Sequence, residues 1–326
     1  TLDDVESRIV FTETTESRTR YTAETGPFDT DYLAALPERG WTLLVHAVEK
    51  HLPAMRRLFA QVPFIPDWRI DDLMVSFAAP GGGVGPHTDN YDVFLCQGIG
   101  VREWHVTEEA VGDDARASDD LALKQPFRGD LHVAREGDVH YLPPGIAHWG
   151  TAKRACITYS IGMRAPQLSD FGGALPDTHG DNPFYEDADL CAAEARPGYI
   201  APQAIERASR LMAKPGESQD IGAALGRYVT ETKAWLRPDG AAPDELRRCL
   251  QDRLRLKVHG MARIAWDDCN VYVNGRCRPL APGEPEIVAT ICRTRELPRR
   301  AAAFATAPEL VEWMLKTGAF EIPGNL

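Results

Sequence analysis

The chain has 326 residues, of which 44% are hydrophobic and 26% are charged, and its formal net charge at pH 7 is −12. This composition is typical of a globular protein, and the length exceeds the roughly 250–300 residues at which a single hydrophobic core stops growing. The acidic charge argues against nucleic acid as a direct partner and is compatible with a basic protein partner. We therefore expect two or more domains.

The sequence contains no features of a membrane protein or of a disulfide-rich secreted protein. No apolar run approaches the ~18 residues that a membrane span needs, and the start, Thr1-Leu-Asp-Asp, does not resemble a signal peptide. The seven cysteines are odd in number and form no Cys-x-x-Cys pair, which fits free thiols. We expect a cytoplasmic protein without a membrane partner. Because the sequence lacks an initial Met, we also expect that its N-terminus has been trimmed.

The first part of the chain is predicted to deliver strands to a glycine-rich loop. Residues 1–40 are polar and show little periodicity, whereas Trp41–His46 is typical of a buried strand. A helix is expected over Val48–Gln61, regular from Pro53 onward. Trp68–Ala79 is predicted to be a long strand that leads into the glycines.

Several short strands are predicted after the glycine-rich loop. Val93–Gln97 and Val101–Val106 are expected to form a hairpin that turns at Gly98–Gly100. An aspartate-rich loop near 113–120 follows. Three more strands are then expected near Leu131–Ala134, Val139–Leu142 and Ala155–Met163. Short strands at this density, separated by Gly and Pro turns, are typical of a β-barrel or jelly roll.

The character of the sequence changes after Arg164. Residues 165–200 are rich in Gly, Pro and Asp and are predicted to be a linker or a long surface segment. Helical patterns follow at Gln203–Ala213, Ile221–Leu236 and Asp244–Leu256. We therefore predict a β-rich catalytic domain over residues 1–165 and a linker with a helical region over 166–256.

Residues 257–326 are predicted to form a small C-terminal α/β unit. Met261–Trp266 and Val271–Val273 alternate like short strands, and Asn274–Gly275 is a turn signal. A last helix is expected over Ala307–Lys316. Its predicted boundaries are a capping box, made by Thr306 and Glu309, and the glycine Gly318.

The stretch Pro80–Phe94, with the sequence PGGGVGPHTDNYDVF, contains the strongest functional signal. His87 and Asp89 are two residues apart, so on an extended strand an imidazole and a carboxylate point to the same side. The glycines before them allow the backbone to approach a bound group closely. This pattern predicts two ligands of a divalent metal. The alternative is a strand whose polar residues face water.

A third metal ligand is predicted at His148, which lies 59 residues after Asp89. It follows the rigid turn Pro143–Gly145 and is expected to project into the mouth of the barrel. Two histidines and one carboxylate with open positions are the ligand set of non-haem Fe(II) oxygenases. His140 is a weaker candidate, because its face of the strand is expected to lie outside the barrel. A loop histidine packed on Trp149 is the structural alternative for His148.

Arg102 is the next candidate functional residue. A charged side chain on a strand that otherwise enters a core must be paired, and a guanidinium grips a carboxylate with two parallel hydrogen bonds. The far carboxylate of 2-oxoglutarate would need such an anchor, whereas a surface ion pair is the alternative. Ser76 and Thr158 could donate hydrogen bonds to the same cosubstrate, although such a residue taken singly is more often a core hydroxyl bonded within the protein.

Acidic and aromatic residues lie around these candidates. Asp71, Asp72 and Asp92 could bind a cationic substrate side chain near the barrel mouth, and the alternative is that they are solvated carboxylates at strand ends. The aromatic residues nearby are predicted to be core residues: Tyr91, Trp104 and Trp149.

Four segments together carry a resemblance to a known family. They are Trp68–Phe77 (WRIDDLMVSF), Pro80–Phe94, Tyr141–His148 (YLPPGIAH) and Tyr159–Pro166 (YSIGMRAP). As a set they resemble the bacterial ribosomal oxygenases of the JmjC/cupin superfamily, and among them the arginine hydroxylases of a large-subunit ribosomal protein. The resemblance is strong over about 65–166 and continues more weakly to the C-terminus.

The resemblance implies a mixed α+β protein with three parts. These are a double-stranded β-helix catalytic domain of the jelly-roll/cupin, JmjC type, a helical dimerisation region that makes a homodimer, and a winged-helix-like C-terminal unit. It also implies Fe(II) bound by His87, Asp89 and His148, and 2-oxoglutarate bound by Arg102 and Ser76. The implied reaction uses molecular oxygen to hydroxylate the β-carbon of an arginine on a basic ribosomal protein. The family's N-terminal Trp and Pro-Leu segment is not evident, and the sequence after residue 164 diverges.

Other functions are also compatible with parts of the pattern. Within the same chemistry, the substrate could be a histidine of another ribosomal protein or a methylated lysine. A metal-binding cupin that isomerises or binds a small sugar would not need Arg102. A non-catalytic adaptor that docks a partner through its helical region would not need the three predicted metal ligands.

Overall fold

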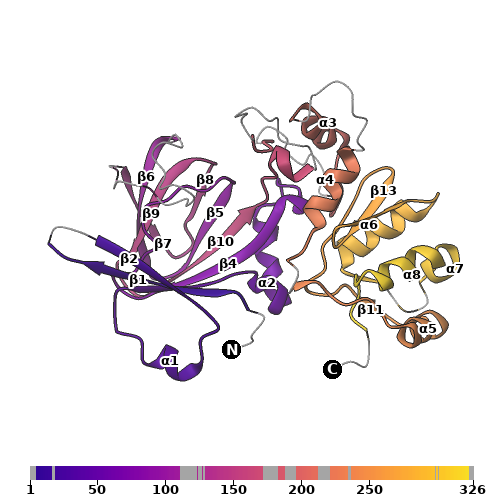
Figure 1. Cartoon of the computed structure of the whole chain (residues 1–326), viewed down its shortest axis with the longest axis horizontal. Coiled ribbons are helices and arrows are strands. Elements are labelled where there is room, and N and C mark those ends of the chain that lie inside the picture. The colour runs from indigo at the N-terminus through magenta and orange to yellow at the C-terminus, as the bar shows by residue number, and fades with distance from the viewer. Residues whose placement is uncertain are drawn as a thin grey trace. The chain divides into compact units, whose positions relative to one another are not determined.

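The computed structural model describes residues 5–16, 19–110, 123, 127, 129–171, 183–187, 196–211, 221–233, 236–297, 299 and 301–322. The chain divides into two compact units, one made of Thr1–Arg56 and Asp71–Arg164 and the other of Arg57–Ile70 and Ala165–Leu326. Figure 1 shows the strands of the first unit in indigo to magenta and the last helices of the second in orange and yellow. The predicted aspartate-rich loop near 113–120 lies outside the described residues. None of the described helices is long and apolar enough to cross a membrane.

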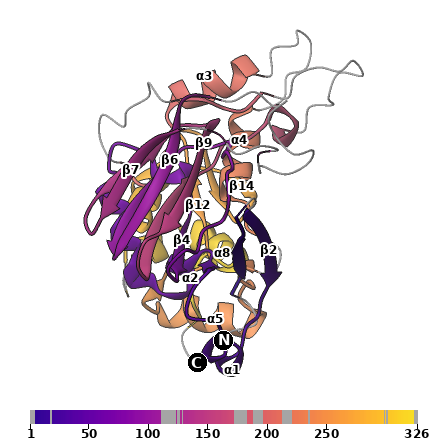
Figure 2. The same cartoon turned by 90° about the vertical axis from the view of Figure 1, so that its left-hand side faces the viewer.

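The first unit is built from two β-sheets. The larger sheet has seven strands in the order β2 (Thr19–Thr25), β1 (Ser7–Thr14), β3 (Trp41–Val45), β4 (Ile70–Ala78), β10 (Cys156–Met163), β5 (Val93–Ile99) and β8 (Val139–Leu142). The smaller sheet, visible in Figure 2, has the order β7 (Asp130–Arg135), β6 (Val101–Ala110) and β9 (Ile146–Ala152). Two such sheets with crossing connections form the jelly roll that the strand density predicts.

The predicted hairpin between β5 and β6 is wrong. β5 pairs with β10 and β8 in the larger sheet, whereas β6 pairs with β7 and β9 in the smaller one. The chain changes sheets at Gly100, whose positive φ of 75° favours glycine, and a Cβ there would overlap the carbonyl oxygen of Ala155. The glycine-rich turn is therefore a corner of the jelly roll.

The two sheets enclose a common interior that is not entirely apolar. One buried apolar cluster includes strands from both sheets: Val93, Leu95, Trp104, Ala134 and Leu142. Residues two apart on a strand point to the same face. Gln97 therefore points into the interior like Leu95, and Arg102 points into it like Trp104. Ser76 of β4 and Thr158 of β10 are also buried. The polar groups needed for a binding site thus lie inside the barrel.

The structure of residues 5–152 differs from prediction in three places: the first two strands, the helix after β3, and strand β9. β1 and β2 were not expected, because most of their residues are exposed and show no alternation. The helix predicted over Val48–Gln61 is interrupted: α2 spans Val48–His51, and Pro53–Gln61 is a 3₁₀ helix. Pro53 lacks the N–H that would continue α2, and no residue of the 3₁₀ segment is buried. The strand β9, which carries His148, was predicted only as a turn and a strand end.

The second unit contains helices around two small antiparallel sheets. The sheets are β12 (Ile264–Trp266), β13 (Asn270–Val273) and β14 (Arg276–Pro279), and β11 (Leu256–Lys257) with β15 (Glu296–Leu297). The helices are α3 (Pro202–Leu211), α4 (Ile221–Thr230), α5 (Pro243–Asp252), α6 (Glu284–Thr294), α7 (Ala303–Thr306) and α8 (Pro308–Lys316). Part of the predicted linker is packed, since Tyr185 is buried with its ring 6.2 Å from that of Trp68.

Several elements of the second unit end at other residues than predicted, or were not predicted. α4 ends at Thr230 rather than Leu236, and Leu256 belongs to β11 rather than to a helix. β14 and α6 were not predicted. The predicted Thr306–Glu309 capping box is wrong, because the Thr306 hydroxyl donates instead to the carbonyl of Ala302, the residue before α7. The turn at Asn274–Gly275 and the stop at Gly318 are confirmed by positive φ angles.

Gly226 of α4 provides a test of packing in the second unit. A Cβ at this position would overlap the ring of Tyr272, which is fully buried and donates a 2.5 Å hydrogen bond to Asp267. Alanine normally stabilises a helix relative to glycine by roughly 0.5–1 kcal/mol. Gly226→Ala should nevertheless destabilise the protein by about 1–3 kcal/mol, because overpacking dominates.

Urea unfolding followed by circular dichroism would measure this change. The control is Arg227→Ala on the exposed face of the same helix, for which we expect a change within about 0.5 kcal/mol. A Gly226→Ala variant as stable as the wild type would contradict this packing.

Candidate metal centre

A pair of backbone hydrogen bonds brings the predicted ligands together. The prediction that His87 and Asp89 lie on an extended strand is wrong, because both residues lie in the loop between β4 and β5. His87 forms an isolated antiparallel bridge with His148 of β9, in which each N–H donates to the other residue's carbonyl at 3.0 and 2.9 Å. The bridge places the loop beside β9, so the two histidines face each other.

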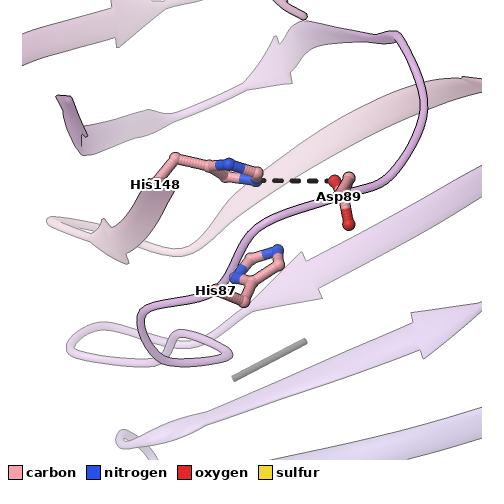
Figure 3. A group of neighbouring side chains, drawn as sticks. All are labelled: His87, Asp89 and His148. Carbon is pink, nitrogen blue, oxygen red and sulfur yellow. Dashed lines mark ion pairs between the residues drawn. The ribbon is translucent and has the colours of Figure 1, made fainter. Parts of the chain in front are cut away.

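The side chains of His87, Asp89 and His148 form a compact group of potential ligands. One ligand atom from each lies within 4.8 Å of the others. The Nε2 atom of His148 is 3.7 Å from the Oδ2 atom of Asp89, and the two imidazole centroids are 4.3 Å apart. Figure 3 shows the three side chains pointing toward a common space. Of the described residues, only these three make such a group.

The tautomers of both histidines are fixed by carbonyl groups. Nδ1 of His87 lies 2.9 Å from the carbonyl oxygen of Gly85, and Nδ1 of His148 lies 3.0 Å from that of Ile146. A carbonyl can only accept, so each Nδ1 carries the proton and each Nε2 keeps its lone pair. Backbone partners of this kind orient metal-binding histidines in many proteins. Two imidazole nitrogens and one carboxylate oxygen suit Fe(II).

The environment of His148 keeps its imidazole neutral. Its side chain is buried, and burial together with the nearby His87 lowers its pKa to about 4, although Asp89 acts in the opposite direction. At neutral pH the ring is therefore available as a ligand without losing a proton.

His140 does not join this group. Its ring lies 5.8 Å from that of His132 in a T-shaped arrangement. The prediction that His140 faces the outside of the barrel is wrong, because His140 pairs with the inward-facing Leu95 across β5 and β8 and therefore shares the inner face. Trp149 does not pack on His148 either, since its ring stacks at 4.5 Å on His105.

Arg102 is buried inside the barrel, as the sequence predicts, with only 4% of its surface exposed. Its Nε and Nη2 atoms have no hydrogen-bond partner among the described residues. The guanidinium carbon lies 5.4 Å from the ring centroid of Trp104, whose own ring is 6.0 Å from that of His148. A buried, unpaired guanidinium is unfavourable in a low-dielectric interior. Its free donors match those that a ligand carboxylate would fill.

Ser76 and Thr158 lie in the same interior, but their hydroxyls differ. Thr158 donates a 3.0 Å hydrogen bond to Oε1 of Gln97, whose amide in turn donates to the carbonyl of Ile99 at 2.8 Å. Within the described part of the chain, Ser76 makes only a long contact of 3.4 Å, with the carbonyl of Thr158. Thr158 is therefore held by the protein, whereas Ser76 is less constrained. Gln97 was missed, although its inward position in the alternation of β5 identifies it.

The three carboxylates that were predicted to lie near the barrel mouth have partners and are not simply solvated. Asp71 accepts a 2.7 Å hydrogen bond from Arg164, and Asp92 accepts one of 2.6 Å from Tyr141. Asp72 accepts from the backbone N–H of Ala47 at 2.9 Å.

Tyr91 lies among these carboxylates as well as against the apolar cluster. Burial raises the pKa of its phenol, and the charges of Asp89, Asp72 and Asp71 raise it further. The candidate ligand Asp89 and the acidic residues of β4 are thus close to one aromatic ring. The core assignment made for Trp104 is confirmed, whereas Tyr91 borders the site.

Residues 57–171 match the model of the JmjC domain. Over 310 residues, 90% of this chain and 80% of the relative, the sequence is 33% identical to the ribosomal protein uL16 3-hydroxylase of Escherichia coli. The chain belongs to the JmjC-domain ribosomal oxygenases. The resemblance inferred from the four motifs is confirmed.

Solved structures agree with this family. The chain matches the ribosomal oxygenase YcfD from Escherichia coli in complex with cobalt and 2-oxoglutarate with a TM-score of 0.67 and 28% identity, over 99% of this chain and 88% of that one. A structure of YcfD with cobalt and succinic acid matches with a TM-score of 0.65 and 27% identity over the same shares. The JmjC/cupin fold of this ribosomal oxygenase is thus established.

The lowered pKa of His148 predicts a pH-dependent stability of the metal-free protein. Between about pH 4 and 6.5 the unfolded chain binds a proton at this residue that the folded chain does not bind. Stability should therefore fall as the pH is lowered through this window, by up to about 3 kcal/mol from this group. His148→Gln should remove that part of the slope.

Urea unfolding with a chelator present, at several pH values, would measure the two slopes. His132→Gln, which changes an exposed histidine, is the matched control and should keep the slope of the wild type. Equal slopes for wild type and His148→Gln would show that His148 titrates normally.

Proposed function

We propose that this protein is an Fe(II)- and 2-oxoglutarate-dependent hydroxylase that acts on an arginine of a large-subunit ribosomal protein. One observation carries the proposal. The group formed by His87, Asp89 and His148 shares a barrel interior with the buried Arg102, whose Nε and Nη2 have no partner among the described residues. A metal centre beside an unneutralised cation fits a dicarboxylate cosubstrate that binds both.

The proposed metal ligands are His87, Asp89 and His148. When bound, the iron supplies the oxidative chemistry, in which 2-oxoglutarate and molecular oxygen yield succinate, carbon dioxide and a hydroxylated substrate. The cobalt, 2-oxoglutarate and succinic acid in the YcfD structures support this cofactor set. The protein contributes ligands, orientation and exclusion of water.

Arg102 is proposed to anchor the far carboxylate of 2-oxoglutarate. Its guanidinium offers two donors in one plane, and the packed ring of Trp104 keeps water from competing for them. Ser76 is proposed as a second donor to the cosubstrate, because its hydroxyl makes only a long contact among the residues that the structure describes. Thr158 is proposed to support the site through Gln97.

The proposed substrate side chain is an arginine, bound at the acidic mouth of the barrel. Asp71 and Asp72 lie on β4. After burial, the charges of the proposed ligand Asp89 and of these two carboxylates raise the pKa of Tyr91, so all three lie near its ring. A guanidinium bound there would lie near the metal centre. The name of the Escherichia coli relative, a uL16 3-hydroxylase, supports a large-subunit ribosomal protein as substrate.

The rest of the chain is proposed to serve assembly. We assign 1–165 to the catalytic domain, 166–256 to a linker and a helical dimerisation region, and 257–326 to a winged-helix-like unit. The three-stranded sheet of β12, β13 and β14 with α6 and α8 supports the last assignment. We further propose a cytoplasmic homodimer that contacts no nucleic acid directly.

Mass spectrometry of ribosomal proteins would test the function. The protein would be loaded anaerobically with Fe(II), then supplied with 2-oxoglutarate, oxygen and purified large-subunit proteins. We expect one protein, uL16, to gain one oxygen atom on an arginine, with succinate formed. Asp89→Ala and Arg102→Ala should lose both signals, whereas the control His132→Ala should keep them.

Other outcomes would identify the alternatives. Oxygen gained on a histidine would indicate a histidine hydroxylase, and loss of a methyl group from lysine would indicate a demethylase. Metal binding without succinate formation would contradict the proposal and indicate a metal-binding cupin of another function.

A further inference from the structure

Where the backbone pairing between β3 and β4 ends, each segment donates a backbone N–H to a carboxylate of the other, which we call the exchange. The last backbone pair of the two strands is Val45 with Val75. Beyond this pair, two side chains take the place of the backbone pairing. The Asp72 carboxylate accepts the N–H of Ala47 at 2.9 Å, and the Glu49 carboxylate accepts the N–H of Leu73 at 3.0 Å. Ala47 with α2 and the start of β4 therefore hold each other reciprocally.

The exchange depends on the backbone of Ala47. This residue has a φ of 53° and ψ of 35°, the left-handed conformation that non-glycine residues rarely adopt. The turn directs the N–H of Ala47 to Asp72 and starts α2, which places Glu49 at Leu73. Strained positions of this kind persist only where the surrounding structure fixes them, and they cluster at functional sites.

Glu49 is an unusual residue for a purely structural contact. It is 2% exposed, and burial raises the pKa of its carboxyl group, with the charge of Asp72 adding to the effect. Burying a carboxyl group is costly unless it is hydrogen-bonded. A valine or leucine would fill the same space without the free-energy cost of burying a carboxyl group. Neither could accept the hydrogen bond from the N–H of Leu73, which Glu49 does.

The exchange fixes the orientation of Asp72. Its Oδ2 atom accepts from Ala47 and lies 3.6 Å from Nδ1 of His46. Its Oδ1 atom points toward Gly162 on the inner side of β10, where a Cβ would lie 3.8 Å from Oδ1 and 3.6 Å from the ring of Tyr91. One oxygen is thus held by Ala47, and the other lies on the side of Gly162 and Tyr91.

We propose that His46, Ala47 and Glu49 form a clamp that positions the Asp72 carboxylate to bind the cationic side chain of the substrate. The clamp rests on the proposed function, because it specifies how the acidic mouth selects arginine. These three are positioning residues, which act through Asp72 rather than on the substrate.

Binding of matched peptides would test the clamp without requiring turnover. The probes are labelled peptides that tile uL16, each made with arginine and with its neutral analogue citrulline, and measured by fluorescence anisotropy. We expect the wild type to prefer one arginine peptide, and Asp72→Asn to lose the preference. Glu49→Ala and His46→Ala should each weaken arginine binding by about tenfold and leave citrulline binding unchanged.

A double-mutant cycle separates positioning from general damage. In the Asp72→Asn background, Glu49→Ala should have no further effect on arginine binding, because it acts through Asp72. Glu49→Gln keeps an acceptor for Leu73 and should restore most of the affinity. The exposed Glu38→Ala is the control for a change of charge. If Glu49→Ala fails to fold, His46→Ala in the same cycle still gives the answer.

Two results would overturn the clamp. One is an additive effect of Glu49→Ala and Asp72→Asn, or an equal loss of arginine and citrulline binding, which would indicate a merely structural role. The other is a wild type that does not distinguish the two peptides. Arginine-selective binding without any gain of oxygen would instead overturn the proposed hydroxylase activity and leave the clamp standing.

Discussion

The two backbone hydrogen bonds between His87 and His148 determine the geometry of the whole site. They join the loop after β4 to β9, and thereby bring ligands from distant parts of the sequence within 4.8 Å. Because the carbonyls of Gly85 and Ile146 fix the tautomers, the backbone also determines which nitrogen of each ring is available. The geometry of the candidate metal centre is therefore set by backbone pairing, which holds one potential ligand atom from each side chain within 4.8 Å of the others.

The electrostatics of the interior follow from this arrangement. His148 is kept neutral by burial, so the cation that the barrel retains beside the metal site is Arg102, buried with unpaired donors. A site with a metal ion and this guanidinium is electrically completed by a dianion. Around Tyr91 the charges are negative, since burial and then the carboxylates of Asp89, Asp72 and Asp71 raise the pKa of its phenol. The interior thus suits a dicarboxylate and the surroundings of Tyr91 suit a cationic side chain, which is the combination the proposed reaction requires.

The sequence predicted those features whose chemistry is local. The spacing of His87 and Asp89, and the turn before His148, identified three residues that the structure brings together. The position of β6 in the second sheet was not predicted. The glycines at Gly98–Gly100 give the same sequence signal whether the turn joins two paired strands or leads from one sheet to the other. The clamp was also missed, since a single buried Glu49 leaves no periodic signal and the left-handed Ala47 is invisible in the sequence. Such features depend on which strand ends meet in three dimensions.

In the proposed site, a metal ion held by His87, Asp89 and His148 binds one end of 2-oxoglutarate and Arg102 binds the other. Titration calorimetry of 2-oxoglutarate under nitrogen, with and without Co²⁺, tests this claim directly, and glutarate, which lacks the keto oxygen, is the matched control. The account predicts that Co²⁺ tightens the binding of 2-oxoglutarate but not of glutarate, and that Arg102→Met weakens both. Equal binding of 2-oxoglutarate with and without the metal, or full affinity in Arg102→Met, would contradict it.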